Sequence, residues 1–125
     1  MTRKVEGPVA SFEAGEDLST TAKAYTFVSI NSSSKAVSPT SISHQPLGVL
    51  QVGGETGQEC SVQIQGIAKV VLGGTIAANV LVGPEADSGK AIALASGASP
   101  AGLIITGGAE DELGEMLILS STLVA

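Results

Sequence analysis

The chain has few aromatic residues, one cysteine and one histidine, and each shortage excludes a class of site. Its 125 residues include no tryptophan, and the only aromatic side chains are those of Tyr25, Phe12 and Phe27. The core must therefore be aliphatic, and a carbohydrate site would lack the aromatic platforms on which sugars commonly stack. The single cysteine, Cys60, excludes a disulfide within the chain. The single histidine, His44, excludes a metal site with several histidine ligands.

Charged residues are scarce too, at 14% of the chain, and their balance is acidic, with a formal net charge of −6. Nucleic-acid affinity comes mostly from lysine and arginine side chains that neutralise phosphates, and Arg3 and Lys4 are the only adjacent basic pair. We therefore expect no nucleic-acid partner. No apolar run approaches the roughly 18 residues of a membrane span, and Glu6, Pro8 and Glu13 interrupt any signal-peptide pattern. We expect no membrane partner and a soluble protein made inside the cell.

Small and aliphatic residues are what the chain has in abundance. Apolar residues make up 43% of it, and 16 glycines and five prolines are spread along its length. This composition favours many short elements joined by tight turns over a few long helices. A chain of this length suits one domain and can bury roughly two-thirds of its unfolded surface without a metal or a disulfide.

The clearest pattern is an alternation with a period of two over residues 60–72. Every second residue there is apolar or small, which places one face of a strand in the core and the other against water or a partner. Gly66 in the middle of this run indicates a bend. Ile67 and Val71 lie on the otherwise polar face of this long bent strand, and we regard them as candidate partner contacts.

Further strands are predicted on both sides of this run. They cover residues 24–30, 35–38, 47–52, 75–82, 91–95, 102–106 and 115–119. About eight short strands at this spacing predict an all-β fold, a small single-domain barrel or sandwich. Residues 1–18 show no steady period and contain Gly7, Pro8 and Gly15, so we interpret them as an extended N-terminal arm before a β domain at 19–125.

No pattern in the chain points to catalysis or to a bound ion. The segment from Gly83 to Ala91 has a spacing close to that of a phosphate-binding loop, but its glycines are one residue too far apart and Ala91 replaces the hydroxyl that binds magnesium. The acidic group at residues 110–115 lacks the alternating ligands of a calcium loop and is better interpreted as a solvated loop. Cys60 falls on the inward face of its strand, as a small buried hydrophobe does. We expect no enzyme, no metal and no cofactor.

Six phrases that follow one another along the chain carry a family resemblance. They are Ala-Gly-Glu-Asp-Leu-Ser at 14–19, Tyr-Thr-Phe-Val at 25–28, Pro-Leu-Gly-Val-Leu-Gln at 46–51, Val-Gln-Ile-Gln-Gly-Ile-Ala-Lys-Val-Val at 62–71, Gly-Gly-Thr-Ile-Ala-Ala-Asn-Val-Leu-Val at 73–82 and Asp-Ser-Gly-Lys-Ala at 87–91. In this order they resemble the capsid decoration (cement, or head-stabilising) proteins of tailed bacteriophages. Residues 120–125 extend past the final strand expected from the resemblance.

The resemblance implies a β-barrel-like protein on the outer surface of a phage capsid, made in the host cytoplasm and assembled as a homotrimer. It would clamp neighbouring subunits of the major capsid protein and so stabilise the shell. The residues that we expect to contact the capsid or a partner combine the arm and the polar face of the long strand: Arg3, Lys4, Val5, Val9, Phe12, Ile67 and Val71.

Three other functions stay open at this point. Another virion structural module, such as a tail or fibre domain, would share the strand pattern. A carbohydrate-binding module is weakened by the absence of tryptophan. A small hydrolase would depend on His44 alone.

Overall fold

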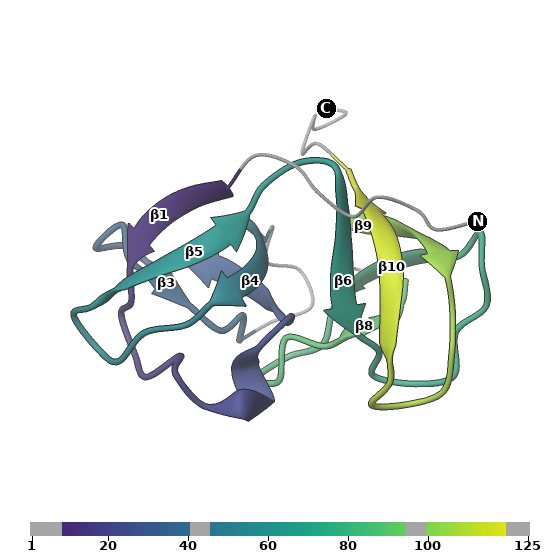
Figure 1. Cartoon of the computed structure of the whole chain (residues 1–125), viewed down its shortest axis with the longest axis horizontal. Coiled ribbons are helices and arrows are strands. Elements are labelled where there is room, and N and C mark those ends of the chain that lie inside the picture. Colours follow the sequence, from purple (N-terminus) through teal and green to yellow (C-terminus); the bar gives the residue numbers. More distant parts are fainter. Residues whose placement is uncertain (1–8, 41–45, 95–99, 120–125) are drawn as a thin grey trace.

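The computed structural model describes residues 9–40, 46–94 and 100–119, and these residues form β-strands with one short 3-10 helix, η1 (Thr21–Lys23) (Figure 1). The first five strands are β1 (Val9–Glu13), β2 (Phe27–Ile30), β3 (Ala36–Val37), β4 (Gly48–Val52) and β5 (Glu59–Gln63). The remaining strands are β6 (Ile67–Val71), β7 (Leu81–Pro84), β8 (Ala91–Ala93), β9 (Gly102–Thr106) and β10 (Leu113–Ile118).

These strands form two five-stranded sheets, and all their named pairings are antiparallel. The first sheet has the order β1-β5-β4-β2-β3 and the second the order β6-β10-β9-β7-β8. Figure 1 shows the two sheets side by side, the first on the left and the second on the right. The all-β prediction is confirmed as a sandwich-like arrangement of two sheets rather than one closed barrel. The described residues hold ten strands, more than the predicted eight.

The predicted long strand over residues 60–72 is two strands that belong to different sheets. β5 ends at Gln63, β6 begins at Ile67, and the chain passes from the first sheet to the second between them. Gly66 turns the chain there with a φ of 88°, a conformation that side chains with a Cβ rarely adopt. The Gln63 Nε2 donates to the carbonyl oxygens of Gln65 and Ile67 at 3.0 and 2.9 Å and holds the turn. The predicted alternation holds within most of each strand but fails at the turn, where Gln63 is buried and Ile64 is exposed, and the predicted continuity was wrong.

The predicted N-terminal arm also needs correction. Residues 9–13 are β1, which pairs with β5 along its whole length, from Val9 opposite Gln63 to Glu13 opposite Glu59. Ala14 and Leu18 follow it into the core with exposed fractions of 0% and 1%. Residues 9–18 thus belong to the folded sheet, and only residues 1–8, which lie outside the described ranges, are left of the arm.

The two sheets repeat one topology. Each strand of the first sheet corresponds to the strand five places later in the second, so that the two orders are the same. In each sheet the residue that follows the first strand in chain order forms one parallel bridge to the third strand in chain order. Ala14 after β1 bridges to Ala36 of β3, and Leu72 after β6 bridges to Ala91 of β8. We call residues 9–64 the first repeat and residues 67–118 the second repeat.

Backbone details confirm the repeat at the level of single residues, with residues 48–64 corresponding to residues 102–118. β4 carries a bulge at Gln51 against β5, and β9 carries the same bulge at Ile105 against β10. Tyr25 and Asn79 both have left-handed φ values, 59° and 69°. Equivalent hydrogen bonds follow in pairs: Tyr25 N to Leu50 O and Asn79 N to Ile104 O, Leu18 N to Gly54 O and Ile76 N to Gly108 O, Gly15 N to Ala36 O and Gly73 N to Ala91 O, Gly57 N to Ala14 O and Asp111 N to Leu72 O.

Each repeat has a core cluster of its own. The first contains only first-repeat residues: Ala14, Leu18, Val28, Ala36, Leu50, Cys60 and Val62. The second contains the equivalents of all of these except Cys60, together with Ala68, Val70 and Ala101, and Phe27 and Val49 of the first repeat also pack into it. The first repeat therefore contributes side chains to the core of the second.

Candidate docking surface

The residues predicted to contact a partner lie on two separate strands. Val9 is 53% exposed on β1, whereas Phe12 on the same strand is half-buried and packs against the first core cluster. Ile67 and Val71 are half-buried on β6, in the other sheet. Arg3, Lys4 and Val5 lie outside the described residues. The structure thus places Val9 and Phe12 in one sheet and Ile67 and Val71 in the other.

Ile67 instead begins a row of apolar side chains that crosses all strands of the second sheet. Leu117 on β10 lies opposite both Ile67 and Leu103 of β9, and Leu103 lies opposite Leu81 of β7. Next in the row is Leu94, whose backbone N–H donates to the Leu81 carbonyl at 3.0 Å. We call Leu81, Leu94, Leu103, Leu117 and Ile67 the leucine row.

The leucine row is open to solvent in the single chain. Leu81, Leu94 and Leu117 are 43%, 37% and 39% exposed, and Leu103 and Ile67 are half-buried. Lone exposed leucines are normal on a protein surface, but a contiguous row across a sheet indicates an interaction surface. This row is the strongest candidate docking surface in the described part of the chain.

Sequence reasoning found Ile67 in this row and missed its leucines, although a signal was present. In the predicted strands 102–106 and 115–119, Leu103 and Leu117 alternate with Ile104 and Met116, which are buried. Alternation alone therefore placed both leucines on the outer face. It could not show that they lie opposite each other, because the sequence of one strand does not specify which strand it pairs with. Val71 similarly lies opposite Leu113, which is 49% exposed.

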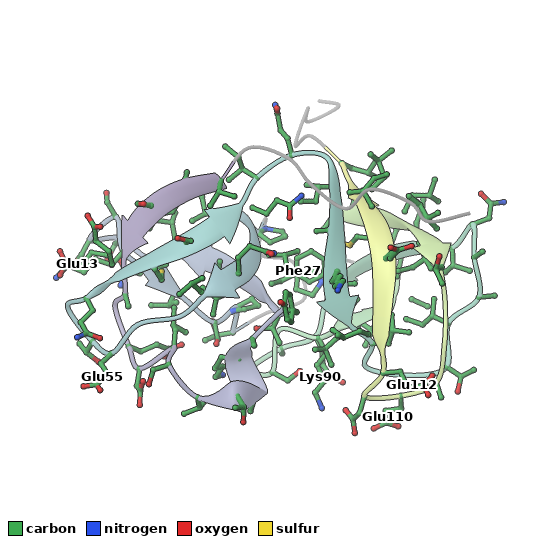
Figure 2. All side chains as sticks on the ribbon, viewed as in Figure 1. Glu13, Phe27, Glu55, Lys90, Glu110 and Glu112 are labelled. Carbon is green, nitrogen blue, oxygen red and sulfur yellow. The ribbon has the colours of Figure 1, made fainter. Side chains whose placement is uncertain are left out.

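Charged groups gather at one end of the second repeat, as Figure 2 shows for Lys90, Glu110 and Glu112. The Lys90 Nζ lies 2.6 Å from Asp111 Oδ1, and the hydrogen bond to that carboxylate raises the pKa of Lys90. Glu112 accepts a hydrogen bond from the Ala109 N–H at 2.8 Å and closes the acidic loop on itself. These contacts order a solvated turn, as predicted for the acidic residues.

The side chains considered for chemistry give little to build on. Cys60 is 2% exposed, its Sγ donates to the Phe12 carbonyl at 3.3 Å, and burial raises the pKa of its thiol. The thiolate, the reactive form of cysteine, is thereby disfavoured. Among the residues that the structure describes, no three His, Cys, Asp or Glu side chains gather as metal ligands, and no helix is long and apolar enough to cross a membrane. His44 lies outside those residues.

Comparison with known proteins adds one strong likeness in fold. No protein-family model matches the chain, and no curated protein matches it in sequence. The structure is similar to the crystal structure of the N base of the head fibre gp8.5 of bacteriophage phi29, with a TM-score of 0.68 and 16% sequence identity. The match covers 94% of this chain and 98% of that one. Nearly the whole all-β fold is therefore shared with that base.

Proposed function

We propose that the chain is a structural protein of a phage virion, a capsid decoration protein that binds the outer surface of the head. In this role it clamps neighbouring major capsid protein subunits, self-associates as a homotrimer and stabilises the shell. The observation that carries the proposal is the fold shared, over nearly its whole length, with the base of a phage head fibre. The ordered phrases that resemble decoration proteins support the same proposal independently.

The form of the molecule is consistent with a clamp. A rigid all-β unit with an acidic exterior presents an exposed apolar row on one sheet and needs no catalytic group to act. Burying extra interface across several coat subunits would strengthen a shell against the pressure of packaged DNA, because buried apolar area stabilises association. Neither nucleic acid nor membrane is a partner in this proposal.

The binding step can be tested on purified heads prepared without this protein. Added chain should bind to saturation at a fixed number of copies per coat subunit, and a cryo-electron microscopy map should show it on the outer surface. Decorated heads should release DNA at a higher temperature than bare heads. Binding without any change in that temperature would contradict clamping, and absence of binding would contradict the whole proposal.

A head-fibre base is the second candidate, and one observation favours it: the similar structure is itself the base of a head fibre. A map of the native particle separates the two. A decoration protein ends in a compact density of about the size of this fold at each lattice site. A fibre base continues outward into a shaft.

A further inference from the structure

The interface between the two repeats shows how the outer face of one sheet is covered within a single chain. Phe27 and Val49 of the first repeat pack into the core of the second, and Figure 2 places Phe27 between the two sheets. Two backbone hydrogen bonds hold the contact. The Phe27 N–H donates to the Gly89 carbonyl at 2.7 Å, and the Val71 N–H donates to the Tyr25 carbonyl at 2.9 Å.

In the second repeat, the residues equivalent to this covered face are the leucine row. Leu81 occupies the place of Phe27, as shown by its pairing with Leu103, which matches that of Phe27 with Val49. Phe27 is 1% exposed, whereas Leu81 is 43% exposed. The next strand gives the same contrast, because Gln63 is 3% exposed and its equivalent Leu117 is 39% exposed. Of the first-repeat equivalents of the leucine row, Phe27, Pro39, Val49 and Gln63 are buried, and Val9 is exposed. The second repeat therefore presents, uncovered, most of the face that the first repeat buries.

The opposite contrast appears at the opening of each core. Val70 and Ala101 of the second repeat are 0% and 3% exposed, because the first repeat covers that core. Their equivalents in the first repeat, Phe12 and Leu47, are larger and yet only half-buried against their own cluster. The edge of the core is therefore open to solvent in the first repeat, whereas in the second repeat it is covered by the first repeat.

We propose that the leucine row of one copy of this chain docks on the first repeat of a second copy, and so repeats between molecules the interface that joins the repeats within one. Leu81 then takes the role of Phe27 and covers the core edge at Phe12 and Leu47. This is a head-to-tail contact between two different faces, so copies add in one direction and either close into a ring or extend as a filament. The inference deepens the self-association in the proposed function and rests on that part alone.

The equivalent hydrogen bonds identify which residues should meet across the contact. The bond from Val71 N to Tyr25 O becomes one from Glu13 N of the next copy to Asn79 O of the first copy. The bond from Phe27 N to Gly89 O becomes one from Leu81 N to Ser34 O of the next copy. Glu13 and Asn79 are both exposed in the single chain, so cysteines at these positions are accessible for trapping.

Disulfide trapping with variants that each gain one cysteine tests the direction of the contact. Glu13→Cys and Asn79→Cys, oxidised separately, should stay monomeric, whereas their mixture should give covalent heterodimers and no larger species. The double variant should give covalent oligomers. The wild type, which retains the buried Cys60, controls for that thiol. Homodimers from either variant alone would indicate a face-to-face contact and overturn the proposal, as would absence of the heterodimer.

Sedimentation equilibrium of the free full chain gives a second, independent test. Leu81→Asp should weaken self-association at least roughly 30-fold, since central apolar residues carry most of an interface's affinity. Val52→Asp is the matched control: among the described residues Val52 is the most exposed large apolar side chain, at 63%, and it lies outside the leucine row. Equal dissociation constants for the two variants would overturn the proposal. A chain lacking residues 2–8 should self-associate with the same dissociation constant as the full chain. A different dissociation constant would show that residues 2–8, rather than a second copy's first repeat, contact the leucine row.

The outcomes separate this inference from the proposed function. A Leu81→Asp variant that is monomeric and still decorates heads leaves capsid binding standing and excludes a need for the head-to-tail contact there. If the Glu13→Cys and Asn79→Cys variants form the heterologous cross-link but the wild type does not bind heads, decoration is contradicted and the contact is confirmed.

Discussion

The first repeat buries a glutamine at the position where the second repeat exposes a leucine. Hydrophobicity alone would predict the reverse, with the leucine buried and the glutamine exposed. Gln63 is almost fully buried, and its amide satisfies two carbonyl oxygens at the turn between the sheets. Leu117 occupies the same place in β10 and is 39% exposed. The two repeats share a backbone but face different surroundings. The difference teaches that side chains on the outer face follow the neighbour they meet, and that no described segment of the chain covers the leucine row.

Removing the first strand of the first repeat should have the largest effect. Deletion of residues 2–13 removes β1, leaves the edge of β5 unpaired and takes away Phe12, so we expect loss of cooperative folding. Deletion of residues 2–8 leaves every described strand in place and should give a normal unfolding transition. Circular dichroism during heating distinguishes the two. A cooperative transition for the longer deletion would show that β1 is a dispensable arm after all.

Truncating the equivalent residues Phe27 and Leu81 should show the clearest difference between the repeats in the free energy of unfolding. Phe27→Ala opens a cavity between the two sheets and should cost about 3–5 kcal/mol. Leu81→Ala removes a side chain already 43% exposed, and in the monomer should change the free energy of unfolding by less than about 0.5 kcal/mol. Urea denaturation at low protein concentration measures both. Similar losses for the two variants would mean that the leucine row is covered in the monomer.

The equivalent glycines Gly53 and Gly107 test whether the two repeats turn in the same way. A Cβ at Gly53 would lie 1.8 Å from the Leu18 carbonyl oxygen, and one at Gly107 would lie 2.0 Å from that of Ile76. Each alanine substitution should therefore cost about 1–3 kcal/mol, since backbone must move to make room. Gly74→Ala is the control, because a Cβ there meets nothing within 4 Å. A large cost in only one repeat would break the equivalence of the turns.

Sequence reasoning succeeded where a single segment carries its own information. The strand at 102–106 was predicted at its observed bounds, and 47–52 begins one residue early, because alternation and flanking glycines act locally. The strand predicted from residue 24 begins only at Phe27, since Tyr25 adopts a left-handed φ of 59° that no pattern of side chains announces. The predicted strand at 75–82 is correct only near its end, where β7 begins at Leu81.

What the sequence could not show was the relation between segments. The repeat escapes notice because many equivalent positions hold unlike residues, such as Tyr25 and Asn79 or Cys60 and Gly114, and share only their place in the backbone. The leucine row is assembled from strands far apart in the chain, so its members look like ordinary surface residues one at a time. Recognising the leucine row as a candidate docking surface therefore required the pairing register of the strands. Recognising that the equivalent face of the first repeat is covered required the whole fold.

The smallest effect concerns a lysine that both repeats place before the third strand. Lys35 meets Glu13 at 3.0 Å and Lys90 meets Asp111 at 2.6 Å, so the equivalent lysines bind carboxylates from different segments. These pairs are largely solvated, and each should contribute at most about 1 kcal/mol. Double-mutant cycles with Lys35→Met and Glu13→Gln, or with Lys90→Met and Asp111→Asn, measure the coupling by urea denaturation.

The pH dependence of the Lys90 pair has a definite sign. The hydrogen bond to Asp111 raises the pKa of Lys90 above its ordinary 10.5, so the folded state holds this proton more tightly than the unfolded state. The stabilisation is then complete below about pH 10.5 and is lost as the pH rises through the higher pKa of the folded state. The coupling measured at pH 7 should accordingly fall as the pH rises above 10.5 and shrink in 1 M salt, which screens exposed charges. A coupling that stayed constant over this range would show that packing of the lysine stem, which titration leaves intact, accounts for the stabilisation rather than its charge.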